Sequence, residues 1–198
     1  MNNPNEKVST QKSSMSTWLE IRKRLNQCSE TDLKGIIGEL YALSKSNKNF
    51  LDARFLTDDT VLKRYEADIQ KYISPYEPWK STQHVSIKDA KKVLSDYKKA
   101  TNDKMGLIHL MIHYVECGTH FLCEFADMYA QYYNSLLSVF ENALTLMKTY
   151  PHEDVQDFVD RMRSISAQVS GIGWGYSDGI TDMLRKAYPI QKVIRVIP

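Results

Sequence analysis

Apolar residues recur every three or four positions over most of the chain between residues 17 and 188, which is the spacing of one face of an α-helix. The longest such stretch runs from residue 107 to 127 and has an apolar stripe opposite a polar face. The stripe comprises Leu107, Leu110, Met111, Tyr114, Phe121, Leu122 and Phe125. Segments that alternate with a period of two are almost absent. The sequence therefore predicts an all-α fold, an irregular array or bundle of seven to nine helices, with an α-solenoid as the alternative.

Capping residues divide this pattern into separate helices. Thr17 or Ser16 is expected to cap a short one, and Ser29 and Ser86 each precede a longer one, because a hydroxyl at this position can accept a backbone hydrogen bond. The helix after Ser29 carries Leu33, Ile36, Ile37, Leu40 and Leu43 on its apolar side and is expected to be interrupted at Asn47. A short helix through Phe50, Leu51 and Phe55 is expected to follow, and Thr57 or Asp58 is expected to cap the helix after that one.

The domain prediction follows from two breaks in the pattern. Residues 1–15 are rich in Asn, Ser, Lys and Gln and are expected to form a flexible polar tail. Residues 74–85 contain Pro75 and Pro78, which interrupt helices and predict a connector. We expect a single all-helical domain over residues 16–198, with this connector inside it.

Charge and cysteine content narrow the class of protein. The net charge of the chain is only +2, while residues 105–184 hold three Lys or Arg against ten Asp or Glu, a balance of −7. Three cysteines form no disulfide framework and are typical of a reducing compartment. The first residues lack the apolar core of a signal peptide, and no run approaches the roughly 20 apolar residues of a membrane span. We therefore expect a cytoplasmic protein without a membrane partner.

Four separated segments resemble proteins of one family: LKGIIGELYALSKSNKNFLDARF (33–55), IKDAKKVLSDYKKA (87–100), HYVECGTHFLCEFADMYAQYYNSLLSVFENAL (113–144) and SGIGWGYSDG (170–179). This is an uncharacterised bacterial family of small helical proteins, known only as a domain of unknown function. The resemblance implies a compact bacterial helical protein and no particular activity, cofactor or catalytic residue. Where the family shows Gly-Asp, this chain has Ala126-Asp127.

The polar face of residues 107–127 is the sharpest chemical candidate. It carries His109, His113, Glu116 and His120, without any Lys or Arg. Two histidines four residues apart on a helix can reach one metal ion, and Zn²⁺ or Fe²⁺ would accept these ligand types. However, the chain has no HExxH or CxxC motif to complete a site. The alternative is a partly buried polar face whose histidines bond to carboxylates and carbonyls.

The glycine-rich segment 170–179 is the second candidate. It lacks the Gly-Lys-Ser/Thr of a phosphate-binding loop. On a helix, Gly171, Gly175 and Gly179 would form a flat strip that permits close packing. This predicts that the segment packs against the helix 107–127 and that Trp174 is substantially buried. The alternative is a ligand pocket built from Trp174, Tyr176 and Asp178.

A lysine-rich face on residues 87–100 offers a third possibility, because lysines can contact phosphates. Asp89 and Asp96 interrupt this face, so nucleic-acid binding is not favoured. The sequence assembles no complete catalytic set. We therefore predict a non-enzymatic intracellular interaction or scaffold module that binds a protein partner or self-associates. The alternatives are a metal-binding or small-ligand-binding protein that uses the histidine face, and a weak nucleic-acid binder that uses the lysine face.

Overall fold

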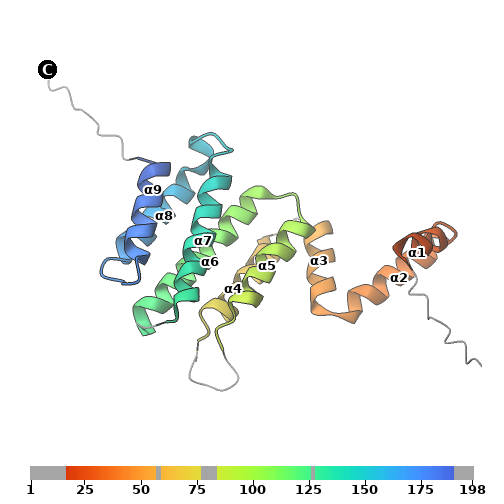
Figure 1. Cartoon of the computed structure of the whole chain (residues 1–198). Coiled ribbons are helices and arrows are strands. Elements are labelled where there is room, and N and C mark those ends of the chain that lie inside the picture. Colours follow the sequence, from red (N-terminus) through yellow and green to blue (C-terminus); the bar gives the residue numbers. More distant parts are fainter. Residues whose placement is uncertain (1–16, 57–58, 77–83, 126–127, 190–198) are drawn as a thin grey trace, which may run out of the picture. The chain divides into compact units, whose positions relative to one another are not determined.

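The computed structural model describes residues 17–56, 59–76, 84–125 and 128–189, and all regular structure within these ranges is helical (Figure 1). The prediction of an all-α fold with seven to nine helices is confirmed, with nine α-helices and one short 3-10 helix in the described part. They are α1 (Trp18–Leu25), α2 (Glu30–Leu43), α3 (Lys45–Phe55), α4 (Asp59–Ile73), α5 (Ile87–Ala100), α6 (Lys104–Phe125), α7 (Ala130–Met147), η1 (Glu153–Val155), α8 (Gln156–Gln168) and α9 (Tyr176–Ala187).

The structure divides into two compact units, residues 1–47 and residues 48–198, where the sequence predicts a single domain from residue 16. The predicted tail (1–15), the middle of the predicted connector (77–83) and the two capping candidates Thr57 and Asp58 lie outside the described residues. None of the described helices is both long enough and apolar enough to cross a membrane.

The first unit contains α1, α2 and the start of α3. As predicted, Thr17 and Ser29 stand at the N-termini of α1 and α2, and each is the first member of a capping box. The backbone N–H of Thr17 donates to the Glu20 carboxylate at 3.1 Å. The Ser29 hydroxyl accepts from the backbone N–H of Asp32 at 3.1 Å, and its own N–H donates to the Asp32 carboxylate at 3.1 Å. These local bonds fix where both helices begin.

The break between α2 and α3 lies at Ser44, so the expected interruption at Asn47 is wrong by three residues. Ser44 adopts an extended backbone with φ −154° and ψ 151°. Its hydroxyl accepts from the backbone N–H of Asn47 at 3.1 Å, which satisfies a free donor in the first turn of α3. Asn47 itself lies inside α3, and its side-chain amide donates to the Leu40 carbonyl at 2.8 Å.

The second unit is built around α6, which packs against α4, α5, α7 and α8 (Figure 1). The C-terminal helix α9 lies against α7 and α8. Because α6 has neighbours on several sides, its buried residues are not limited to the predicted stripe. Ile108, Ile112 and Val115 are also fully buried. Phe125, by contrast, lies at the C-terminal end of α6 and is exposed.

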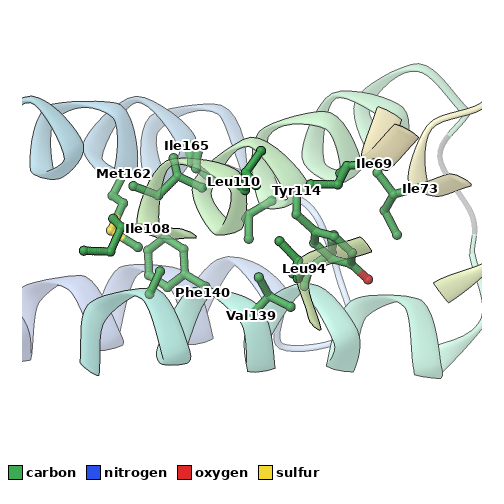
Figure 2. Packing of buried hydrophobic residues seen from close by; sticks show 14 of the residues in the cluster. Ile69, Ile73, Leu94, Ile108, Leu110, Tyr114, Val139, Phe140, Met162 and Ile165 are labelled. Carbon is green, nitrogen blue, oxygen red and sulfur yellow. The ribbon is translucent and has the colours of Figure 1, made fainter. Parts of the chain in front are cut away.

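The core of the second unit is continuous across these helices. In Figure 2, Ile108, Leu110 and Tyr114 of α6 lie among buried side chains of neighbouring helices. Tyrosine hydroxyls within it are paired: Tyr114 and Ser135 share a hydrogen bond of 2.6 Å. Among the described residues, no buried side-chain nitrogen or oxygen lacks a hydrogen-bond partner. Because the buried polar groups of this core are hydrogen-bonded, the core holds α6 in one position, and with it the polar face that α6 carries.

Candidate functional site

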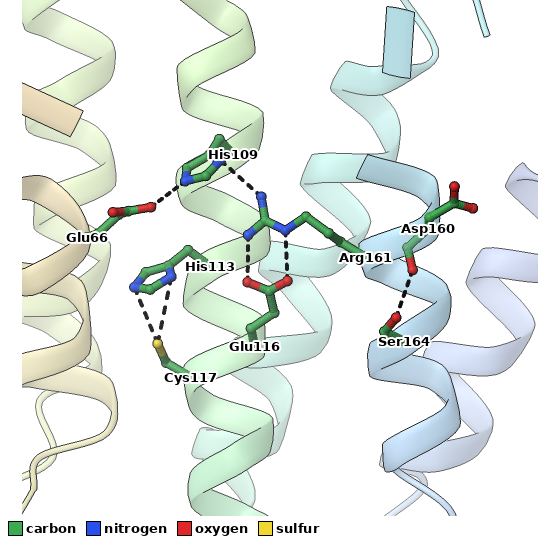
Figure 3. A network of polar contacts seen from close by, with 8 residues as sticks. All are labelled: Glu66, His109, His113, Glu116, Cys117, Asp160, Arg161 and Ser164. Atoms are coloured by element: carbon green, nitrogen blue, oxygen red, sulfur yellow. Dashed lines mark hydrogen bonds and ion pairs between the residues drawn. The ribbon is translucent and has the colours of Figure 1, made fainter. Parts of the chain in front are cut away.

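The predicted polar face of α6 lies between α4 and α8 at His109, His113 and Glu116 (Figure 3). His109, His113 and Glu116 are half-buried there, whereas His120 lies further along the helix and is exposed. The histidine face is therefore for the most part an interior contact surface of the second unit.

His109 is held between two residues of different helices. Arg161 of α8 approaches the Nδ1 atom of His109 with its Nη1 at 3.0 Å, and Glu66 of α4 contacts the Nε2 atom. A guanidinium has only N–H donors, so Nδ1 accepts and Nε2 carries the hydrogen that is donated to Glu66. This arrangement requires the neutral form of the His109 ring.

Arg161 also binds Glu116 through a bidentate ion pair. Its Nε donates to Oε1 at 2.8 Å, and its Nη2 donates to Oε2 at 2.5 Å. Such bidentate, charge-assisted pairs are among the stronger polar contacts in proteins. A chain of contacts consequently runs from Glu66 through His109 and Arg161 to Glu116, and it joins α4, α6 and α8.

His113 and Cys117 contact each other, with 3.4 Å between Sγ and Nε2, and His113 also forms a hydrogen bond with the backbone of Glu66. Burial lowers the pKa of His113 below its ordinary value of 6.5, and burial raises the pKa of the Cys117 thiol to about 12. Reactive cysteines require the opposite, a lowered thiol pKa. The pair therefore does not supply a thiolate nucleophile.

The four candidate metal ligands do not converge on one point. Glu116 and His109 contact Arg161, His113 contacts Cys117, and His120 lies 3.1 Å from Glu124 on its own helix. Within the described residues there is no group of three or more His, Cys, Asp or Glu side chains placed to hold a metal ion. The contacts match the alternative in which histidines bond to carboxylates. The sequence did not identify Glu66 and Arg161 as partners of this face. The signal for Arg161 was that a helix face carrying Glu116 has no Lys or Arg of its own, so that a cation from another helix has to lie opposite it.

Two predictions for the glycine-rich segment are wrong. Trp174 is 67% exposed, and its ring stacks on Tyr133 of α7 with 6.2 Å between ring centroids. Gly171 and Gly175 are not on a helix; they adopt left-handed backbone angles, φ 85° and 70°, with open space where a Cβ would stand. The helical strip therefore does not form.

The segment nevertheless reaches the central helix through Tyr176, the first residue of α9. Tyr176 is fully buried, and its hydroxyl shares a 2.6 Å hydrogen bond with Thr119 of α6. Close approach does occur at Gly179, where a Cβ would lie 2.8 Å from Leu137 of α7. Trp174 and Asp178 are exposed while Tyr176 is enclosed, so these three residues do not face a common space.

A groove of about 500 Å³ lies between α8 and α9, lined in part by Arg163, Arg185 and several hydroxyl groups. Sequence reasoning did not identify it. Arg163 is paired with Asp160 at 2.9 Å and Arg185 with Asp182 at 3.7 Å, each on its own helix. Each of the two arginines that line the groove thus has a carboxylate partner on its own helix.

The lysine face of α5 is interrupted in the structure as it is in the sequence. Lys92 forms an ion pair with Asp96 at 2.5 Å. The Ser86 hydroxyl accepts from the backbone N–H of Asp89 at 3.3 Å, so Ser86 caps α5 as predicted. The face is therefore a mixed, partly neutralised helix surface.

The first unit has an apolar surface. From the sequence, its apolar residues were used only to predict helices and were not identified as a binding surface. Neither α1 nor α2 contains a buried residue. We define the apolar face of the first unit by seven large side chains that are between 37% and 75% exposed: Trp18, Leu19, Ile21, Ile36, Ile37, Leu40 and Leu43. Exposed large apolar side chains that gather on one part of a protein mark interaction sites.

Comparisons of this chain with protein-family models, with curated proteins and with solved structures found no match. The resemblance described above therefore stays a prediction, and the function has to be inferred from the residues themselves.

Proposed function

We propose that the protein is a non-enzymatic helical interaction module, and that the apolar face of the first unit is its binding surface. The observation that carries this proposal is the absence of any buried residue from α1 and α2, together with the exposure of their large apolar side chains. A partner that covers this face would remove the apolar side chains from water, which is the main favourable term in association.

The lengths of the two helices support the proposal. α1 has 8 residues and α2 has 14, and isolated helices shorter than about 12–15 residues are marginal in water. α2 also contains Gly35 and Gly38, each of which costs about 1 kcal/mol relative to Ala in a helix interior. Helices with such weak intrinsic stability obtain their stability from packing, so we infer that α1 and α2 pack against a partner.

The second unit supports the non-enzymatic part of the proposal. Its histidine face is engaged in ion pairs and hydrogen bonds, and the raised pKa of Cys117 keeps that thiol protonated. The proposal includes a cytoplasmic location, which the three free cysteines support. For metal binding at the histidine face and for nucleic-acid binding at the lysine face, no contact in the described residues adds support.

Site-specific photo-crosslinking in cells tests the proposed surface. A photoreactive amino acid is placed at Leu40, on the apolar face, or at Ala42, which lies on the opposite side of α2 at about 100° per residue. We expect a discrete covalent adduct with a second polypeptide from position 40 and none from position 42. Equal labelling at both positions, or none at position 40, contradicts the proposal.

A further inference from the structure

We infer that the occupant of the apolar face is a second copy of this chain. The inference rests on the proposed function and names its partner. In this arrangement α1 of one chain lies against α2 of the other, and the same contact occurs a second time around a two-fold axis. The four helices then enclose the apolar faces of both copies, as in a four-helix bundle.

The size of the apolar face fits a dimer. Its seven side chains leave on the order of 700 Å² exposed, close to the roughly 800 Å² that each partner contributes to a standard protein interface. A single surface of this size needs no additional element from elsewhere to form a stable contact. The face is also continuous along α2, where Ile36, Ile37 and Leu40 fall within one side of the helix.

Charge complementarity specifies how the two copies pair. α1 carries Arg22, Lys23 and Arg24 against Glu20, a net charge of +2. α2 carries Glu30, Asp32 and Glu39 against Lys34, a net charge of −2. A two-fold contact of α1 with α2 brings opposite charges together twice, whereas α1 against α1 or α2 against α2 would bring like charges together.

The charged residues lie where such a contact needs them. At about 100° per residue, Arg22 and Arg24 flank the side of α1 that carries Trp18 and Ile21. Glu39 lies beside the apolar side of α2 in the same way. These side chains would form the polar rim of the interface, where charges act mainly on partner choice.

The oligomeric state of the full chain provides the first test, by light scattering during size-exclusion chromatography. The chain has a mass of 22.9 kDa, and we expect twice this mass for the wild type at micromolar concentration. Leu40→Glu should reduce the mass to that of one chain, and Ala42→Glu should leave it doubled. Glutamate is a good helix former, so neither variant removes α2. A monomeric wild type, or a dimer that Leu40→Glu does not affect, overturns the inference.

A mixing experiment tests the pairing of α1 with α2. One variant reverses the net charge of α1 (Arg22→Glu with Arg24→Glu), and the other replaces the rim carboxylate of α2 by a lysine (Glu39→Lys), which brings the net charge of α2 to zero. In each variant alone the charges at positions 22 and 24 have the same sign as the charge at position 39, so we expect weaker self-association than in the wild type. An equimolar mixture restores opposite charges at both contacts and should form a one-to-one heterodimer. Failure of the mixture to dimerise better than either variant alone overturns the assignment.

The crosslinking experiment separates this inference from the proposed function. A product from position 40 with twice the mass of the chain supports self-pairing. A product of another mass, obtained with a monomeric wild type, overturns self-pairing and leaves the proposed function standing. The absence of any product from position 40 contradicts the proposed function itself.

Discussion

Arg161 should contribute more to stability than any surface arginine of the same helix. Its guanidinium makes a bidentate pair with Glu116 and a third contact with His109, and the side chains of Arg161 and Glu116 are 27% and 33% exposed. Arg161→Ala removes all three contacts and leaves the Glu116 carboxylate half-buried without its cation.

The expected loss can be bracketed from two limits. Breaking a fully buried ion pair costs about 3–5 kcal/mol, and breaking an exposed one costs about 0–1 kcal/mol. With roughly a third of each partner exposed, we expect a loss of about 2 kcal/mol in the free energy of unfolding. Arg161→Lys should recover only part of it, because a single ammonium cannot reproduce the bidentate pair and also reach His109.

Urea denaturation followed by far-UV circular dichroism measures this loss, and α8 supplies a matched control. Arg163 pairs with Asp160 at 2.9 Å, with side chains 37% and 58% exposed. Arg163→Ala should cost less than about 0.5 kcal/mol. Equal unfolding midpoints for Arg161→Ala and Arg163→Ala would refute the reasoning.

Three further predictions concern single residues. Burial lowers the pKa of the His113 imidazole, so this ring is protonated at a higher pH in the unfolded chain than in the folded one. The stability that neutral His113 contributes is therefore present above pH 6.5 and is lost as the pH falls from there through the folded-state pKa. Urea midpoints of His113→Gln should fall less over that range than those of the wild type. Trp174→Ala should change the thermal midpoint little because the indole is exposed, whereas Tyr176→Ala should cost about 3–5 kcal/mol; a reversed order would contradict the burial of the two side chains. Gly118→Ala should destabilise the protein by about 1–3 kcal/mol in the same assay, because a Cβ at this position would overlap the Leu136 side chain and lie 3.1 and 3.2 Å from the Cδ1 and Cγ atoms of Leu136. Greater stability of this variant, as expected if the helix propensity of Ala dominates, would contradict the prediction.

Local features of this fold could be predicted from the sequence. The N-termini at Ser29 and Ser86 were found because a capping hydroxyl bonds within three residues of itself. The burial of residues outside the apolar stripe of α6 was not predicted, because periodicity shows which residues are apolar but not how many helices surround them. Ile108 and Ile112 lie off the predicted stripe and are buried only because several helices pack on α6.

The candidate site shows the same division between local and distant contacts. Periodicity placed His109 and Glu116 on one polar face, which is correct. Their partner Arg161 is 45 residues beyond Glu116, and no local pattern connects them. Trp174 was misplaced for a different reason: glycines spaced by four suggested a helix, whereas Gly171 and Gly175 serve turns that need positive φ.

The contact chain from Glu66 through His109 to Arg161 also has a consequence for motion. α4 and α8 are both bonded to the same imidazole ring, which uses one nitrogen for each. Moving either helix away breaks a bond on which the ring orientation of His109 depends. Opening fluctuations of α4, α6 and α8 should therefore be coupled, so that their slowest-exchanging amide hydrogens share one opening free energy and exchange with deuterium as a group.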